Sequence, residues 1–298
     1  MTVVPMEPDY IKLKPVKPAI AGYIRESQIL LKDPDIVYET AVHDIRVLMK
    51  KARAVLKLVA HQTDNPFYDR DTAELKEVGR ILSCFRDTSV QRKIMKSYKK
   101  EFPDIFYQLR DNPNLNVLLE KHDSLVNPPE KIKEALNETD ILLGKTGYRI
   151  RFQSMNSIDP HLLLKELDSS YTIVSDLYLK CRNNTKPKNL HRFRQKAKDF
   201  LYQLYIFRPL NPSVIKVLEK KLENMTQNLG KFNDLNQIVG ELDYNYQKGA
   251  NLPALDELIL MIRDMQDKYL TRVWATSYQV FCPGKNLVNV LGFKLLVI

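Results

Sequence analysis

The sequence predicts an all-α fold built from two repeated helical bundles, and three observations support this prediction. Apolar residues recur at spacings of three and four along most of the chain, which is the period of a helix with one buried face. The 298 residues include only 9 glycines, too few for the many tight turns of an all-β or dinucleotide-binding fold. A helical pattern of the first half also recurs in the second half, as a duplicated unit requires.

The periodicity places four helices in each half of the chain. The ranges expected to be helical are 20–32, 35–59, 71–100 and 129–143, followed by 160–180, 189–207, 212–246 and 253–278. Asp33-Pro34, Asp159-Pro160 and Asn211-Pro212 each place a capping residue directly before a proline, an order typical of helix starts.

The remaining segments divide the chain into five regions. Away from the two ends of the chain, the segment from Gly144 to Ser157 has the weakest helical pattern. For the tail after Pro283 we expect either a docked strand or a poorly ordered end. We therefore expect an N-terminal segment over 1–17, a first bundle over 18–143, a linker over 144–158, a second bundle over 159–278 and a tail over 279–298.

The internal repeat aligns two stretches in each half. AVHDIRVLMKKARAVLKLV, which starts at residue 41, matches NLHRFRQKAKDFLYQLYIF, which starts at residue 189, when His43 is set against His191. Further on, ELKEVGRILSCFRD aligns with KLENMTQNLGKFND, so that Asp87 matches Asp234. The histidine and the aspartate lie 44 residues apart in the first copy and 43 in the second, which indicates two copies of one bundle.

The first stretch of the repeat carries a basic stripe on one helix face. At about 100° per residue, its cationic and imidazole side chains share an arc of roughly 80°, opposite an apolar face. In the first copy these side chains are His43, Arg46, Lys50, Arg53 and Lys57. In the second copy His191, Arg194 and Lys198 cluster in the same way, together with the phenol of Tyr202. Leu201 stands where the first copy has Arg53, so we expect the second stripe to be weaker.

Side chains of one sign at helical spacing repel each other, which indicates an anion that offsets the repulsion rather than a merely solvated face. Arginine and lysine bind phosphate oxygens and histidine adds a donor, and a row of them suits a polymer. On the next expected helix, Lys76, Arg80 and Arg86 extend the stripe. Asp87 and Asp234 have two interpretations, either as carboxylates that orient a neighbouring arginine or histidine, or as helix-end caps.

The overall charge agrees with an anionic partner. The net charge is +10 and the sequence pI is about 9.3, a balance typical of proteins that bind nucleic acid, phosphate polymers or membrane surfaces. The three cysteines are far apart and form no CxxC pair, which favours a reducing cytoplasm and argues against zinc. No signal-like or membrane-spanning apolar run occurs in the sequence. We expect a cytoplasmic protein that does not bind membranes.

The His-x-x-Arg-x-x-x-Lys-x-x-Arg pattern from His43 to Arg53, its weaker copy at His191, and the Phe-Arg-Asp and Phe-Asn-Asp ends resemble the CHAD family, the conserved histidine α-helical domains. The resemblance covers roughly residues 18–275. It implies two bundles related by pseudo-twofold symmetry, basic helices that line a central channel, and binding of inorganic polyphosphate without catalysis or cofactor. The implied lining is His43, Arg46, Lys50, Arg53, His191, Arg194, Lys198 and Tyr202.

Two departures from the family pattern bear on the second stripe, namely Leu201 at a position that is usually basic and Asn233 in place of an arginine. The Glu-x-Glu-x-Lys motif of the CYTH domains to which CHAD domains are often fused does not occur, so we expect a stand-alone module. Association with polyphosphate granules stays open at this point.

The sequence leaves two other functions open. The His43-Asp44 and His122-Asp123 dipeptides match the signature of metal-dependent phosphohydrolases, but such a site needs several converging His and Asp ligands. The repeat aligns Asp44 with Arg192, so the dipeptide is not duplicated.

Binding of RNA or DNA is the stronger alternative, because the charge permits it and tyrosines can stack on bases; no nucleic-acid-binding motif occurs. We expect a binding protein, not an enzyme.

Overall fold

The computed structural model describes residues 13–33, 38–63, 65–83, 87–120, 129–153, 158–246 and 253–292. Within these ranges the chain forms α-helices, one short 3-10 helix and turns, and no strand. The predicted all-α class is therefore confirmed. No described helix is both long and apolar enough to cross a lipid bilayer.

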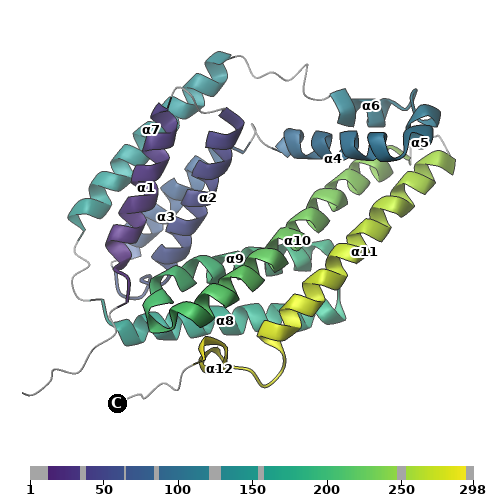
Figure 1. Cartoon of the computed structure of the whole chain (residues 1–298). Coiled ribbons are helices and arrows are strands. Elements are labelled where there is room, and N and C mark those ends of the chain that lie inside the picture. Colours follow the sequence, from purple (N-terminus) through teal and green to yellow (C-terminus); the bar gives the residue numbers. More distant parts are fainter. Residues whose placement is uncertain are drawn as a thin grey trace, which may run out of the picture.

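The helices form three groups (Figure 1). The first bundle contains α1 (Val16–Lys32), α2 (Tyr38–Lys57), α3 (Asn65–Ile81) and α7 (Pro129–Phe152). The second contains α8 (Pro160–Asn183), α9 (Pro187–Phe207), η1 (Arg208–Leu210), α10 (Pro212–Tyr246), α11 (Pro253–Phe281) and α12 (Leu287–Leu291). The third, α4 (Asp87–Glu101), α5 (Pro103–Gln108) and α6 (Pro113–Glu120), packs against the far ends of α10 and α11.

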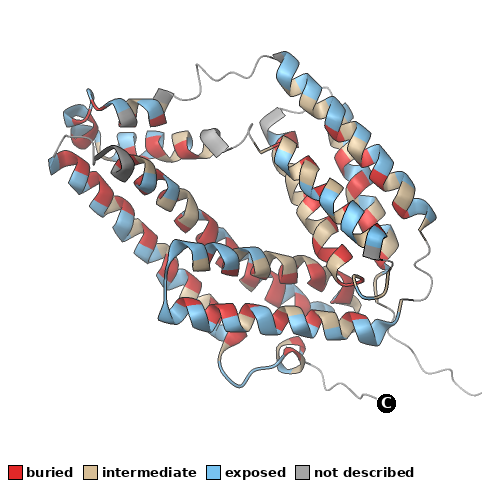
Figure 2. Cartoon of the chain, turned by 180° about the vertical axis from the view of Figure 1, so that it is seen from behind, coloured by how far each residue is buried: buried red, intermediate tan, exposed pale blue. Residues whose placement is uncertain are grey.

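One hydrophobic core joins the two bundles. It runs from α1 through α2, α3 and α7 to α8, α9, α10 and α11, and Figure 2 shows that each long helix buries one side and exposes the other. The central contact is between α2 and α9, where the Gln203 side chain donates a hydrogen bond of 3.1 Å to the backbone carbonyl of Ala54. Because burial of apolar surface dominates stability, α2 and α9 are held together by the same core that folds each bundle.

The helix predicted over 71–100 is wrong in one respect, because it is two helices. α3 ends at Ile81 and α4 begins at Asp87, with a turn at residues 82 and 83. Both the backbone N–H and the side-chain hydroxyl of Ser83 bind the carbonyl of Arg80, at 3.0 and 2.7 Å. A serine that satisfies a carbonyl in this way competes with continuation of the helix.

The prediction of a linker over 144–158 is also wrong for most of that range, because α7 continues to Phe152. Ile150 and Thr146 are buried, and a Cβ at Gly147 would lie 3.2 Å from Cγ2 of Ile24 on α1. The glycine that weakens the helical pattern therefore permits close packing of α7 on α1. Residues 154–157 lie outside the described residues.

The tail after Pro283 is neither a strand nor poorly ordered as far as Gly292, since residues 287–291 form α12. Asn286 and Asn289 make a reciprocal capping box at its start, and Gly292 ends it at φ 72°, a conformation that favours glycine. Leu291 is buried and its carbonyl accepts a hydrogen bond of 3.0 Å from the side chain of Asn211.

Two of the three predicted helix starts are confirmed. Asp159 accepts a hydrogen bond of 2.8 Å from the backbone N–H of His161 at the start of α8. Asn211 accepts one of 3.4 Å from Val214 at the start of α10. The third start, at Asp33-Pro34, adjoins residues 34–37, which lie outside the described residues.

Candidate anion-binding site

The helix α2 has the two faces that the sequence predicts. Its apolar face is buried, with Ile45, Leu48, Met49, Ala52, Val55 and Leu56 each at most 3% exposed, as is Val59 in the turn after the helix. The opposite face carries His43, Arg46, Lys50, Arg53 and Lys57, all of which are half-buried. A charged face that is merely solvated would be exposed, so this stripe is flanked by other parts of the protein.

The helix α9 repeats this arrangement with two differences. Phe193, Ala197, Phe200, Leu204 and Phe207 are fully buried. On the polar face Arg194, Lys198 and Tyr202 are half-buried, whereas His191 is exposed and lies 2.7 Å from the side-chain nitrogen of Gln195. Leu201 belongs to the core and is 6% exposed. The position that carries Arg53 in the first copy therefore serves packing in the second.

The structure brings the end of the α2 stripe against α9. The Lys57 ammonium forms an ion pair with the carboxylate of Asp199, which reaches across from α9. Burial raises the pKa of the Tyr68 phenol on α3, while the charge of Arg53 lowers that pKa and the charge of Asp199 raises it. These four side chains from α2, α3 and α9 therefore lie within electrostatic reach of one another. Nε of Arg53 is buried and makes no hydrogen bond within the described part of the chain.

Arg194 is positioned by α10. Its Nε donates a hydrogen bond of 3.2 Å to the backbone carbonyl of Thr226, and its guanidinium lies on Gly230, where a Cβ would come within 3.1 Å of Nη2. Burial raises the pKa of the nearby Tyr202 phenol to about 12, although the Arg194 charge opposes the rise. The arginine fork thus has a fixed direction beside a phenol that stays protonated at neutral pH.

The remaining predicted residues have mixed outcomes. The Lys198 ammonium lies 5.9 Å from the Tyr202 ring centroid, within the range of a cation–π contact. Lys76 is exposed on α3. Arg80 is also exposed, and its guanidinium holds the carboxylate of Glu77 at 2.8 Å and lowers the pKa of that carboxyl. An anion at Arg80 would therefore compete with Glu77.

The two aspartates are placed differently. Asp234 is half-buried in the interior of α10, so its interpretation as a helix-end cap is wrong; its interpretation as an orienting carboxylate stays a prediction. Asp87 is the first residue of α4. The side chain of Asp87 and the whole of Arg86 lie outside the described residues.

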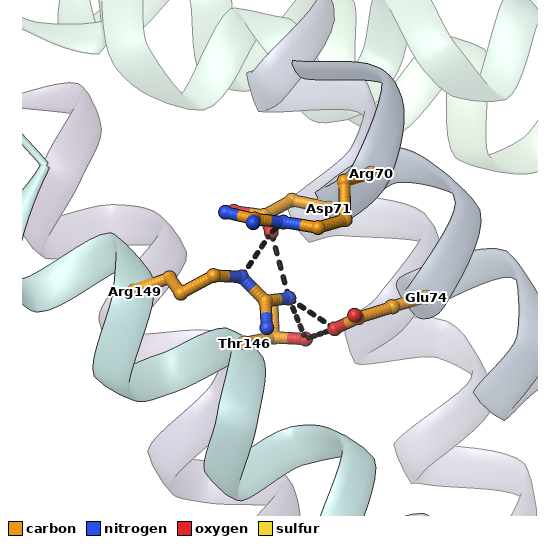
Figure 3. A network of polar contacts seen from close by, with 5 residues as sticks. All are labelled: Arg70, Asp71, Glu74, Thr146 and Arg149. Atoms are coloured by element: carbon orange, nitrogen blue, oxygen red, sulfur yellow. Dashed lines mark hydrogen bonds and ion pairs between the residues drawn. The ribbon is translucent and has the colours of Figure 1, made fainter. Parts of the chain in front are cut away.

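Sequence reasoning missed a partly buried polar network between α3 and α7 (Figure 3). Arg149 donates from Nε to Asp71 at 2.9 Å and also contacts Glu74, which accepts a hydrogen bond of 2.6 Å from Thr146. Burial raises the pKa of the fully buried Asp71 despite Arg149. For Glu74 burial also acts upward, but hydrogen bonds from Thr146 and Arg149 lower its pKa. The network fixes α3 to α7, and Arg149 escaped notice because it lies in the expected linker.

Asp199, Thr226 and Gly230 were also missed as parts of the site. One signal was available, because Asp199 is an acid in the otherwise basic stretch RQKAKD of the second stripe. No such signal exists for Thr226, which contributes its backbone carbonyl.

Comparison of the chain with known families gives a match. The family model of the CHAD domain matches residues 25–242, from within α1 to within α10, and so includes both basic helices. The chain belongs to the CHAD family. A search of the curated proteins gives no match. In the described residues of this CHAD domain, no three His, Cys, Asp or Glu side chains gather closely enough to hold a metal ion.

Proposed function

We propose that this CHAD domain binds inorganic polyphosphate without hydrolysing it, through the basic faces of α2 and α9. The observation that carries the proposal is that two stripes of one charge, 148 residues apart in the sequence, lie on helices that contact each other. Positive charges on neighbouring helices repel one another, and a bound polyanion would reduce that repulsion. The family resemblance supplies the identity of the anion.

The side chains suit a chain of phosphates. Arginine binds two oxygens with its planar fork, while lysine offers a compact charge on a flexible stem. Half-buried cations act on an anion through less screening water than exposed ones do. Arg194, whose direction is set by Thr226 and Gly230, therefore provides a fixed contact, and the lysines provide adaptable ones.

A pseudo-twofold axis between the two stripes is the second part of the proposal. On such an axis, a residue meets its own counterpart from the other copy. The repeat pairs Ala54 with Tyr202, and Ala54 in fact contacts Gln203, only one residue away from its counterpart. This contact supports a twofold relation between α2 and α9, with the stripes beside the axis as the walls of a basic channel.

Competition among polyanions tests the proposal. Long-chain polyphosphate, single-stranded RNA and duplex DNA would compete for the purified protein at about 150 mM salt, where weak surface attraction is screened. We expect polyphosphate to displace both nucleic acids at equal phosphate concentration, because no base contact is needed. A preference for nucleic acid would contradict the proposal.

The absence of catalysis has its own test. Phosphate release from polyphosphate would be measured with and without Mg²⁺ or Mn²⁺, and we expect none under either condition. Metal-dependent phosphate release that is lost in His43→Ala and Asp44→Ala variants would instead favour the hypothesis that the His43-Asp44 dipeptide belongs to a phosphohydrolase site.

A further inference from the structure

The net charge of the chain is concentrated in one stretch. Residues 177–198 contain eight lysines and arginines and no aspartate or glutamate. The whole chain has 46 basic and 36 acidic residues, so 38 basic and 36 acidic residues remain outside this stretch. Residues 177–198 therefore supply eight of the ten net positive charges. Such an imbalance creates a local field that attracts polyanions.

Half of these cations precede the stripe of α9, at the point where α8 ends and α9 begins. Lys180 and Arg182 belong to the last turn of α8, Lys186 is the residue directly before α9, and Lys188 is in its first turn. We call these four residues the hairpin cations. All four are exposed, and in the described part of the chain no ion pair joins any of them to a carboxylate.

The backbone that carries the hairpin cations is fixed. The backbone N–H of Asn184 donates to the carbonyl of Lys180 at 2.9 Å, and its side-chain oxygen accepts from the backbone N–H of Lys186 at 3.2 Å. The Arg182 guanidinium lies 5.4 Å from the centroid of the Trp274 ring on α11, within the range of a cation–π contact. Arg182 therefore has a partner within the protein, and the three exposed lysines remain for a ligand.

The hairpin cations lead directly into the stripe of α9. Lys188 comes three residues before His191, and side chains at this spacing are neighbours on a helix surface. His191 is exposed, whereas Arg194 and Lys198 are half-buried. Cations thus follow one another from the solvent to the half-buried part of the proposed site. From Lys186 to Lys198 this row is about 18 Å long, at a rise of about 1.5 Å per residue.

We propose that the hairpin cations form an outer binding site for long polyphosphate chains, which holds the part of the polymer that extends beyond the stripe of α9. This inference rests on the proposed function, because continuity with the stripe is what favours polyphosphate over other polyanions. Exposed ion pairs are individually weak. Binding of one segment of a polymer to the stripe, however, raises the effective concentration of the next segment at the hairpin.

Chain length separates the outer site from the stripe. Polyphosphates of increasing length, from tripolyphosphate to long-chain polymer, would be titrated into the full chain and into the variant Lys180→Gln/Lys186→Gln/Lys188→Gln. At about two-fold per lysine, we expect the affinity for the long-chain polymer to fall about ten-fold. For the shortest polyphosphate that binds, the affinity should fall less than two-fold, because that ligand fills the stripe alone.

A variant of equal charge provides the matched control. Lys131→Gln/Lys133→Gln/Lys145→Gln removes three exposed lysines from α7, which packs on α1 and α3. At about 150 mM salt, charges more than about 8 Å from the ligand are largely screened, so its affinity for the long-chain polymer should fall less than two-fold. Circular dichroism establishes that the variants are folded. If the triple hairpin variant is unstable, Lys186→Gln/Lys188→Gln carries the test, with an expected loss of about four-fold.

The outcomes separate this inference from the proposed function. Failure of the wild type to bind any polyphosphate overturns both. Wild-type binding with unchanged long-chain affinity in the hairpin variant, or with equal losses in the hairpin and α7 variants, overturns only the outer site. Single-stranded RNA and vesicles that contain phosphatidylserine are tested in parallel. If the hairpin variant loses binding to either of them and keeps its affinity for long-chain polyphosphate, the hairpin serves that other polyanion and the outer site is overturned.

Discussion

The second stretch of the repeat, residues 74–87 in one copy and 221–234 in the other, is broken in the first copy and continuous in the second. α3 ends and α4 begins inside it, whereas α10 runs through it unchanged. Ser83, which ends α3 by binding the Arg80 carbonyl, aligns with Gly230, which lies within α10. Glycine has the lower helix propensity of the two, so tertiary packing decides where the helix breaks: α4 leaves its own bundle to cover α10 and α11.

The two basic stripes differ in a related way. In α9 the guanidinium of Arg194 is fixed by Thr226 and Gly230 of the unbroken α10, and Leu201 belongs to the core. In α2 the same position as Leu201 is Arg53, whose Nε makes no hydrogen bond within the described residues. The comparison indicates that α9 provides fixed geometry and that α2 provides more of the charge.

The largest effect, a loss of stability, is expected from substitutions on the buried faces of α2 and α9, where the two copies are most alike. Met49→Asp in α2 and Phe200→Asp in α9 each place a carboxylate at a position at most 1% exposed. An unpaired buried charge and a lost apolar contact together should lower the free energy of unfolding by at least about 4 kcal/mol. Thermal unfolding followed by circular dichroism measures this loss.

Gln195→Asp is the control for these variants, because Gln195 is exposed on α9. Its melting temperature should stay close to that of the wild type. A folded Met49→Asp or Phe200→Asp variant of normal stability would mean that the faces of that helix are assigned the wrong way round.

These faces are also what the sequence predicts best. Apolar residues at spacings of three and four depend only on the helical period, so the cores of α2 and α9 could be read directly. That period does not predict the end of α3 at Ile81, where Ser83 binds the Arg80 carbonyl. It does not predict the extension of α7 through Gly147 either, because that extension depends on the contact with Ile24 of α1. Glycine and serine weaken a helix locally, and only packing decides whether the helix continues.

The next effect concerns binding, and it compares the two arginines that the repeat aligns. Arg46→Glu and Arg194→Glu should each weaken polyphosphate binding about 100-fold, because charge-assisted hydrogen bonds to phosphate are replaced by repulsion. Arg194→Glu should also destabilise the fold by about 1 kcal/mol, since it loses the hydrogen bond to Thr226. Fluorescence titration and chemical unfolding measure the two quantities separately.

Arg192→Glu makes the same change of charge at an exposed position of α9 that lies off the stripe. Its affinity should fall less than three-fold. Unchanged affinity in Arg46→Glu would remove α2 from the proposed site. Equal losses of affinity in all three variants would mean that binding depends on the net charge of the protein and not on particular positions.

A smaller effect is expected when the first copy is given the residue of the second. Arg53→Leu should lower the affinity for polyphosphate about ten-fold. Stability should stay within about 0.5 kcal/mol of the wild type or rise, because a half-buried cation is replaced by an uncharged apolar side chain. The exposed Arg25 on α1 provides the control Arg25→Leu. A large loss of stability in Arg53→Leu would show that Arg53 holds α2 to its neighbours rather than serving an anion.

The site was harder to predict than the core for a physical reason. The positions of the cations follow from one helix, but Asp199 acts on the other copy, where it pairs with Lys57 of α2. Likewise, Arg194 is oriented by a backbone carbonyl and by the missing side chain of Gly230. Contacts of this kind between helices exist only once α2, α9 and α10 are assembled.

The smallest expected effect concerns Asp199, and it tests whether this carboxylate of α9 weakens polyphosphate binding by the cations of α2. Asp199→Asn removes the carboxylate that forms an ion pair with Lys57, and we expect the affinity for polyphosphate to rise about three-fold. The loss of this ion pair should lower the free energy of unfolding by less than about 1 kcal/mol. Asp256→Asn, at an exposed position of α11, changes the net charge equally and should leave the affinity unchanged. Weaker binding by Asp199→Asn would mean that the carboxylate orients Lys57 for the ligand. A stronger affinity means that an incoming phosphate displaces Asp199, so that the second copy limits how tightly the first one binds.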